Sequence, residues 1–508
     1  MKLQLPPSVK NWLSLVGSII ALTALFMIVF LFIVTSILRE QAVYLGLVTY
    51  ILLPSVMIVG LLFILAGVLL KLRRERREGV RPAVGWPKLD LEEPRQRNAF
   101  FIFVVGSAIF VLLSAVGSYE AFQYTESTRF CGTLCHAVME PEYTAHQHSP
   151  HAQVACAACH VGPGADWYVR SKLSGLYQLY ATVADVYPRP IPTPIKNLRP
   201  ARAVCEQCHW SQKFYGHKLQ LRTHYRPDRD NTPWRIGLNM KIGPPQASLG
   251  LIEGIHWHVN TRVRVDYIAA DPGLQQIPWV RYTNLDSGEV KVFRDKGPLP
   301  KGGMPPRGEV RTMDCIDCHN RPSHLYLSPE QFINGAMAAG RIPAELPEIK
   351  RLAVKFCTTQ YPSVAAAREG IRAGITSFYQ LKYPDLFARQ RVLIEKGVVG
   401  VEEEFAQNIF PFMKVRWQAY PDNIGHLYSS GCFRCHNGSH RSDKGEVIRR
   451  DCTLCHDIVI QGIPGKGLEV ARVGESLEFR HPENVGGAWR DYSCTDCHTG
   501  GAPEEMGH

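Results

Sequence analysis

Apolar and polar positions divide the chain into a membrane-like beginning and a longer, mixed remainder. Three long runs with almost no charged residue come first, at 12–38, 44–70 and 99–117. A helix of ~20 apolar residues spans the ~30 Å hydrocarbon core of a bilayer, so the runs predict three membrane helices, the second kinked at Pro54. A cleaved signal peptide is the alternative for the first run. That run is too long for one, and no small-residue cleavage site follows before Arg39.

Basic residues predict how these helices are oriented. The loop 71–98 carries nine Lys or Arg, whereas the connection after the first run holds Arg39 beside Glu40. Loops rich in Lys and Arg stay in the cytoplasm, so everything after the third run is expected on the opposite side of the membrane. The same loop could dock on anionic lipid, although a topogenic role is the simpler interpretation.

After the third run, apolar residues are interspersed with polar ones instead of forming long uninterrupted stretches. Apolar residues recur every three or four positions from Val169 to Val183, among several Trp and Tyr, which predicts an amphipathic helix. It either lies on the bilayer surface or packs within its own domain. Alternation between 227 and 312 predicts a small β-rich insertion with a hairpin across Asp286–Gly288. Ser328 and Ser363 are expected to cap later helices.

The candidate chemistry lies in seven cysteine pairs, each followed at once by histidine. We number them motifs 1 to 7 in chain order: Cys131, Cys135 and His136; Cys156, Cys159 and His160; Cys205, Cys208 and His209; Cys315, Cys318 and His319; Cys432, Cys435 and His436; Cys452, Cys455 and His456; and Cys494, Cys497 and His498. They use fourteen of the fifteen cysteines. Cys357 remains and is expected to be a buried free thiol.

This spacing is typical of covalent haem attachment. Two nearby thiols can add to the two vinyl groups of one haem while the following histidine binds the iron. A zinc site would need two cysteine pairs per metal, and a disulfide framework would not require a histidine after every pair. We therefore expect seven covalently bound c-type haems.

Haem also changes the meaning of the net charge. The chain carries a formal charge of +11, which by itself would suggest nucleic acid or anionic lipid as a partner. Each haem brings two propionates, so seven haems would add about fourteen negative charges. The basic residues are better interpreted as compensation for propionates, and no nucleic-acid partner is expected.

The histidines outside the motifs indicate what kind of haem protein this is. Twelve of the nineteen histidines are left, enough to fill the second axial position of every iron. A filled position favours electron transfer over chemistry at the metal. The candidates are His151, His224, His256 or His258, His324, His426, His440 and His481, with His256 and His258 on one side of an extended segment. The sequence does not assign them to individual haems.

Around motifs 1 and 2 the chain resembles a known family. The apolar run leading into Phe130-Cys131, the nearby Met139 and the stretch His151–His160 are similar to the NapC/NirT family of membrane-anchored quinol dehydrogenases. This likeness covers roughly residues 100–225. Beyond it, haem count and layout resemble the seven-haem inner-membrane cytochromes of metal-reducing bacteria.

The resemblance implies roles for particular residues. Met139 would bind the iron of the first haem, and Lys172 would line the quinol site with Asp185 or Asp166 as the nearby carboxylate. Two departures from the family pattern concern the first haem. Motif 1 has three residues between its cysteines, and Met139 follows His136 by three positions rather than two.

The expected architecture is a membrane-anchored multihaem cytochrome c. Three transmembrane helices precede a mainly α-helical and irregular, haem-packed extracytoplasmic region with a small β insertion. Its expected parts are a membrane anchor at 1–118 with the basic cytoplasmic loop 71–98, a NapC/NirT-like domain with haems 1–3 at 119–226, the β-rich insertion at 227–312, and a C-terminal domain with haems 4–7 at 313–508.

The function expected from these features is quinol oxidation in the bacterial inner membrane during anaerobic respiration. Electrons from (mena)quinol would pass one at a time through seven haems to periplasmic c-type cytochromes or a terminal reductase. One alternative is a multihaem reductase acting on a small nitrogen or sulfur oxyanion, and another is a reverse relay into the quinone pool. A haem-based sensor would need an output domain, and none is visible in the 28-residue cytoplasmic loop.

Overall fold

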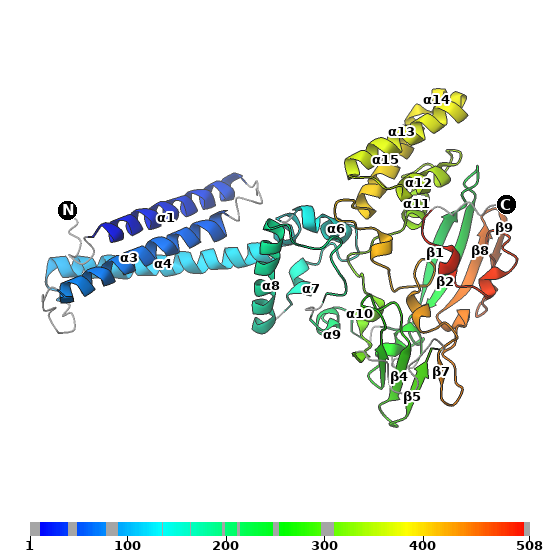
Figure 1. Ribbon diagram of the computed structural model, residues 1–508, viewed down its shortest axis with the longest axis horizontal. Helices are drawn as coiled ribbons and strands as arrows, with labels where there is room; N and C mark the ends of the chain where they lie inside the picture. The colour runs from blue at the N-terminus through cyan, green and yellow to red at the C-terminus, as the bar shows by residue number, and fades with distance from the viewer. Residues whose placement is uncertain are drawn as a thin grey trace. The chain divides into compact units, whose positions relative to one another are not determined.

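The protein forms two compact units. The computed structural model describes residues 11–38, 48–77, 90–134, 136–162, 164–195, 199–210, 214–246, 253–295 and 309–501. The anchor unit comprises residues 1–136 with 155–157, and the main unit comprises 137–154 with 158–508. Figure 1 shows the helices of the first unit and the mixed helices and sheets of the second.

The anchor unit contains the three predicted apolar helices. They are α1 (Trp12–Leu38), α3 (Leu53–Arg77) and α4 (Pro94–Glu126), and a π-helical turn, η2 (Val48–Leu52), leads into α3. All three are long and apolar enough to cross a membrane. Pro54 lies just after the π-helical turn, at the start of α3, and α4 extends beyond the predicted run at both ends. Residues 78–89 of the basic loop lie outside the described residues.

Small residues let α1 and α3 approach closely. A Cβ added to Gly17 would lie 2.6 Å from the carbonyl oxygen of Gly60. The Ser14 hydroxyl also donates to the carbonyl of Ile64 at 3.2 Å. Lipid provides no hydrophobic drive for helix association, so close packing of small residues and interhelical hydrogen bonds carry it. The short helix α5 (Thr128–Thr133), capped by Ser127, then leads into motif 1.

Short helices carry the first motifs. Motif 1 ends at the start of α6 (His136–Gln147), motif 2 forms α7 (Cys156–His160), and motif 3 begins in α9 (Ala201–Cys205). Between motifs 2 and 3 lies α8 (Ala165–Val183), which confirms the predicted amphipathic helix.

Two antiparallel sheets form the β part of the main unit. One has the order β1-β2-β8-β9, from His217–Tyr225, Pro233–Lys241, His456–Ile463 and Lys466–Val470. The other has the order β6-β3-β4-β5-β7, from Arg311–Thr312, Val263–Ile268, Trp279–Asn284, Val290–Arg294 and Arg441–Ser442. The pairing of β4 with β5 confirms the predicted hairpin.

A small β-rich insertion is expected at 227–312. In the structure, the strands of this segment share both of their sheets with strands from elsewhere in the chain. Strands β7, β8 and β9 come from the last third of the chain and complete both sheets. An edge strand leaves unpaired backbone donors and acceptors, so strands that meet in space pair across sequence boundaries. The residues between 217 and 312 therefore share their sheets with the region that carries motifs 5 and 6.

Five helices form a separate apolar core between motifs 4 and 5. They are α11 (Pro329–Ala338), α12 (Ile349–Thr358), α13 (Val364–Lys382), α14 (Pro384–Arg389) and α15 (Arg391–Asn408). Ser328 and Ser363 cap α11 and α13 as predicted. Phe332, Ile371 and Phe405 are almost fully buried in this core, and Cys357 is buried there too. The helices contain no haem motif, and α11 packs against β1.

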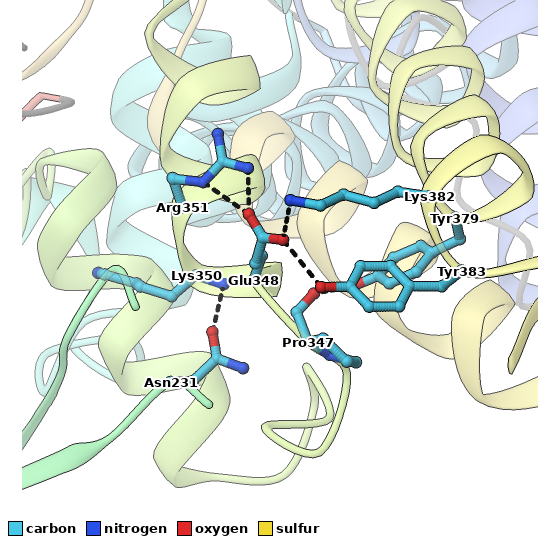
Figure 2. Close-up of polar contacts among 8 residues, drawn as sticks. All are labelled: Asn231, Pro347, Glu348, Lys350, Arg351, Tyr379, Lys382 and Tyr383. Atoms are coloured by element: carbon cyan, nitrogen blue, oxygen red, sulfur yellow. Dashed lines mark hydrogen bonds and ion pairs between the residues drawn. The ribbon is translucent and has the colours of Figure 1, made fainter. Parts of the chain in front are cut away.

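One charged side chain joins the start of α12 to the end of α13 (Figure 2). Glu348 precedes α12 and has φ +61°, a left-handed conformation that is costly for a residue other than glycine. Its carboxylate accepts hydrogen bonds from Lys382 at 2.5 Å, from Tyr383 at 2.9 Å and from Arg351. Burial opposes ionisation, but these donors outweigh it and lower the pKa of Glu348 to about 2.

The remaining elements are single turns around the other motifs and candidate ligands. They are η5 (Ile255–Val259), α10 (Cys315–Cys318), η6 (Trp417–Ala419), η7 (Gly431–Arg434), η8 (Cys452–Leu454), η9 (Ala488–Arg490) and α16 (Cys494–Cys497).

Candidate haem-binding sites

A tight turn shapes the motifs. In motif 4 the amide of His319 donates to the carbonyl of Cys315 at 2.8 Å. The same contact occurs in motifs 3, 5 and 7, at 2.7, 3.0 and 2.7 Å. Residues three apart in a helical turn lie on one face, so both thiols point the same way and the histidine follows directly.

Capping residues explain why acidic side chains occur inside two motifs. Asp314 caps the turn of motif 4, and the Asp317 carboxylate accepts in return from the amide of Asp314 at 2.6 Å. Ser493 and Asp496 make the same reciprocal pair around motif 7. Such capping boxes satisfy backbone donors at a helix start. These aspartates therefore shape the turn that presents the thiols.

Each of six motif histidines faces one histidine from elsewhere in the chain. The ring centroids are 6.1 Å apart for His160 and His324, 6.0 Å for His209 and His151, 6.2 Å for His319 and His256, 5.8 Å for His436 and His258, 6.3 Å for His456 and His426, and 6.0 Å for His498 and His481. The six pairs share one spacing although they come from unrelated local structures.

This spacing fits one metal between two imidazoles. A metal–imidazole nitrogen bond is about 2.0–2.1 Å long, so two histidines on opposite sides of a metal place their ring centroids ~6 Å apart. Two stacked rings in van der Waals contact would lie closer than this. The donor set therefore fits a haem iron with a histidine on each face.

The second ring nitrogen of several histidines is held by the backbone. Nδ1 donates to a carbonyl in the candidate ligands: His151 to Pro322 at 3.1 Å, His256 to Ile242 at 3.0 Å, His258 to Ile255 at 2.9 Å, His324 to Glu142 at 3.1 Å, and the motif histidine His436 to Arg449 at 2.9 Å. Ligating histidines commonly make this bond, which fixes the tautomer and orients the ring. It leaves Nε2 to bind the iron.

Partial burial favours the neutral, metal-binding form of two candidate ligands, His324 and His426. It lowers the pKa of His324 and of His426 to about 4, and a neutral imidazole is the species that binds a metal. In the described part of the chain, no group of three or more His, Cys, Asp or Glu could hold a metal ion.

The expectation that His256 and His258 share one side of an extended segment is wrong. Both lie in the 3₁₀ turn η5. A helical turn rotates residues two apart onto different faces, so His256 faces motif 4 while His258 faces motif 5. One short turn thus serves two motifs.

Two other candidates do not face a motif histidine in the described residues. His440 is fully buried, with Nδ1 bonded to Asn437 at 3.0 Å and Nε2 to the Ile277 carbonyl at 2.7 Å, so neither nitrogen is left for a metal. His224 lies on β1, where its Nδ1 contacts Asn334 at 3.4 Å. Burial lowers its pKa to about 4. The structure therefore brings together six of the eight candidates with motif histidines.

Motif 1 is described only in part. Cys131 lies in α5, and Cys135 lies outside the described residues. Met139 is half-buried in α6, the helix that begins at His136. Its role at the first iron stays a prediction.

Neighbouring thiols show that motifs 3 to 7 adjoin one another in chain order. Cys205 of motif 3 and Cys315 of motif 4 share a hydrogen bond. Burial and the nearby Cys432 thiol raise the pKa of Cys318 to about 11, and they also raise that of Cys455 to about 11. Between motifs 6 and 7, the Cys494 sulfur lies 3.7 Å from Nδ1 of His426. A row of sites results, each next to its successor.

The segment Cys315–His324 connects three motifs. It contains all of motif 4, and His324 at its end faces His160 of motif 2. Its Pro322 carbonyl accepts the hydrogen bond from His151, the residue opposite motif 3. Motifs 2, 3 and 4 are therefore tied to one ten-residue stretch.

The candidate quinol residues lie on or near α8. The Lys172 ammonium lies 4.9 Å from the ring centroid of Tyr168, one turn toward the helix start. A helix rises about 1.5 Å per residue, so Asp166 is about 9 Å from Lys172 along the axis. Asp185 lies beyond the far end of α8, where it pairs with Arg189. Asp166 is therefore the nearer of the two candidate carboxylates to Lys172 along the chain, and the role of either stays a prediction.

An apolar stripe runs along the same helix. Val169, Leu173, Leu176, Tyr180 and Val183 are all exposed, at spacings of three and four. Exposed contiguous apolar surface usually marks a contact with lipid, ligand or protein. The stripe provides a surface beside Lys172 on which an apolar ring could lie.

Arg434, inside motif 5, is a functional candidate that sequence reasoning missed. It is buried, and its guanidinium donates only to backbone carbonyls: Gly431 at 2.9 Å, Leu274 at 2.8 Å and Asp317 of motif 4 at 2.6 Å. The one available signal was a charged residue between two cysteines. Arg434 joins motifs 4 and 5 and places a positive charge between them.

The chain is similar to known cytochromes. The N-terminal region of the NapC/NirT cytochrome c family matches residues 93–190. The chain is also 41% identical, over 498 residues, to the cytochrome c-type protein ImcH of Geobacter sulfurreducens, covering 98% of this chain and 96% of that protein. No solved structure matches the chain significantly.

Proposed function

We propose that this chain, which belongs to the NapC/NirT cytochrome c family, oxidises membrane quinol and relays the electrons to an acceptor outside the cytoplasm. It is a membrane-anchored multihaem cytochrome c with three candidate membrane helices. Beyond this family membership, we propose the number of haems, quinol as the substrate and the direction of electron flow.

The observation that carries the proposal is the set of six facing histidine pairs. When bound, each c-type haem supplies a one-electron carrier, and a histidine on both faces closes the iron to small ligands. The protein holds four of the rings in place through backbone carbonyls. A seventh site at motif 1, with Met139 as the second ligand, completes the proposed count.

The quinol site is proposed at α8. A quinol loses protons as well as electrons, so the site needs a polar group beside an apolar surface. Lys172 and Asp166 provide the polar groups, and the exposed stripe that includes Leu173 and Leu176 provides the surface. Lys172 would steer or accept the proton while the stripe orients the ring.

The proposed location is the bacterial inner membrane with the main unit in the periplasm. The basic loop 71–98 supports this orientation through the positive-inside rule. The partners would be the menaquinone pool and periplasmic c-type cytochromes or a terminal reductase. The order of motifs 3 to 7 supports a relay that ends far along the chain from the quinol site.

The rival reductase function has less support. An enzyme that reduces a small oxyanion needs an iron with an open position. Six motif histidines here face a second histidine, and motif 1 has Met139 close by in sequence. A reverse relay into the quinone pool would use the same residues, because the direction of electron flow depends on the reduction potentials of the haems and their partners.

Mixing the purified full-length protein with a menaquinol analogue tests the proposal. We expect the quinol to reduce the same haems that dithionite reduces. The change in haem absorbance should follow a rate that depends on the quinol concentration. A protein that dithionite reduces but quinol does not would contradict the proposed function. Reduction of nitrite, hydroxylamine or sulfite at comparable rates would favour the reductase.

A further inference from the structure

Motif 7 differs from the other motifs in what lies beside its histidine. The Nδ1 atom of His498 is 3.9 Å from a carboxylate oxygen of Glu330, close enough for the negative charge to act on the ring. In the other described pairs, Nδ1 of five histidines bonds to a backbone carbonyl, and Nδ1 of His426 contacts the Cys494 sulfur. Among the described motif histidines, His498 is the one for which we find a carboxylate at this distance.

Glu330 is held in this position by its surroundings. It lies in the first turn of α11, and its amide donates to the carbonyl of Gly500 at 3.2 Å. Burial, and the negative charge of the nearby Glu330 carboxylate, raise the pKa of Tyr428 well above its usual range. The Tyr428 ring also stands edge-on to His498, with centroids 6.3 Å apart at 85°. Tyr428 thus lies beside both the carboxylate and the imidazole.

The chain beyond motif 7 is anchored to the same helices. The indole of Trp417 donates to the carbonyl of Thr499 at 2.8 Å. Gly500 has φ +80°, and a Cβ there would lie 2.4 Å from the Cβ of Ser328, so glycine allows the close approach to α11. The contacts of Thr499 and Gly500 with Trp417 and Ser328 therefore hold motif 7 beside α11, which carries Glu330.

We propose that Glu330 is a positioning residue that orients His498 and lowers the reduction potential of the haem at motif 7. A carboxylate beside a ligating histidine increases the basicity of that ligand. A negative charge nearby also stabilises the more positive, oxidised iron. This inference rests on the proposed function, and it makes Glu330 a determinant of which acceptors the last haem can reduce.

Redox titration of the purified full-length protein tests the inference. In Glu330→Gln the amide keeps the size of the side chain and removes its charge. We expect one haem midpoint to rise, with the reduced-to-oxidised ratio at the wild-type midpoint about tenfold higher, which for a one-electron couple is about 59 mV. The matched control is Glu369→Gln, an exposed glutamate on α13 of the same helical core, which should titrate like wild type.

Two further variants show which haem is affected and provide a test if Glu330→Gln fails to bind that haem. In a chain that lacks Cys494 and Cys497, adding Glu330→Gln should change none of the remaining midpoints. Glu330→Asp moves the charge away by one methylene and should raise the same midpoint by a smaller amount. If Glu330→Gln loses the haem of motif 7, the aspartate variant decides, and unchanged midpoints there overturn the inference.

Counting the haems distinguishes a failure of the proposed relay from a failure of the proposed role of Glu330. A wild-type protein whose peptide around Cys494 and Cys497 carries no haem by mass would contradict the proposed relay. A protein with a full haem complement, but identical titrations for wild type and Glu330→Gln, would contradict only the role of Glu330.

Discussion

The rings of His256 and His319 are almost parallel, with an interplanar angle of 3° and centroids 6.2 Å apart. The pair His258 and His436 stands at 88°, although His256 and His258 share one turn. Parallel imidazoles act on the same iron d orbital and split the d levels, whereas perpendicular ones act on two orbitals equally. The relative ring orientation therefore has a spectroscopic consequence.

Electron paramagnetic resonance of the oxidised protein should show two classes of low-spin haem. Motifs 4 and 6, with interplanar angles of 3° and 19°, should give rhombic signals. Motifs 3 and 5, at 82° and 88°, should give strongly anisotropic signals with a large maximum g value. A spectrum with only rhombic low-spin signals would show that the imidazole planes turn when haem binds.

Removing His324 should open one iron. In His324→Ala the iron at motif 2 loses the imidazole that faces His160, so one haem should become high-spin and bind carbon monoxide. Visible spectra with and without carbon monoxide measure this. His440→Ala is the control, because both ring nitrogens of His440 are bonded within the protein and no new carbon monoxide binding is expected.

Replacing Lys172 should impair entry of electrons from quinol. We expect Lys172→Ala to slow reduction by quinol at least tenfold, a loss of about 1.4 kcal/mol of transition-state stabilisation. Dithionite should still reduce every haem. Asp166→Asn should give a similar defect, whereas Asp185→Asn should not, because Asp185 lies beyond α8 and pairs with Arg189. Quinol kinetics like wild type in Lys172→Ala would remove it from the site.

Met139 should set the potential of the first haem. A thioether ligand raises the potential of a haem relative to imidazole, so Met139→His should lower one midpoint and slow electron entry. Spectroelectrochemical titration gives the midpoints. If they stay as in wild type, another group holds that iron and Met139 serves packing alone.

Acid should weaken the helical core through Glu348. Its folded pKa of about 2 lies below the ordinary 4.5, so its stabilising contribution is complete above pH 4.5 and is lost as the pH falls from there toward 2. The shift corresponds to about 3 kcal/mol at most. Amide hydrogen exchange in α12 and α13 should be faster in Glu348→Gln at pH 6 than in wild type. At pH 2 to 3 this difference should nearly vanish, and one that stays constant with pH would contradict the assignment.

Local patterns predicted much of the structure. The apolar runs, the caps at Ser328 and Ser363 and the hairpin of β4 and β5 depend on neighbouring residues, and all three are confirmed. The sheet of β1, β2, β8 and β9 was missed: its central pairing, β2 with β8, joins segments far apart in the chain, although β1 with β2 and β8 with β9 are local pairs. Alternation of Leu219, Leu221 and Thr223 within β1 was an available signal for its first strand.

The candidate ligands show the same limit. The motif residues follow from spacing, but the pairing of histidines with motifs depends on long-range folding. His440 and His151 look alike in sequence, and only the fold shows that His440 bonds to Ile277 while His151 faces His209. The influence of Glu330 on His498 was equally invisible, since α11 and motif 7 meet only in the folded chain.

The order of the paired histidines has a consequence for maturation. Of the six residues that face a motif, His324 alone follows its motif in the chain, and the other five precede theirs. Synthesis proceeds at ~5–20 residues per second, so His324 emerges on the order of ten seconds after His160. A haem joined to Cys156 and Cys159 within that interval would have one iron face open to oxygen and other ligands. Haem attachment at motif 2 would then need that face protected until His324 is in place.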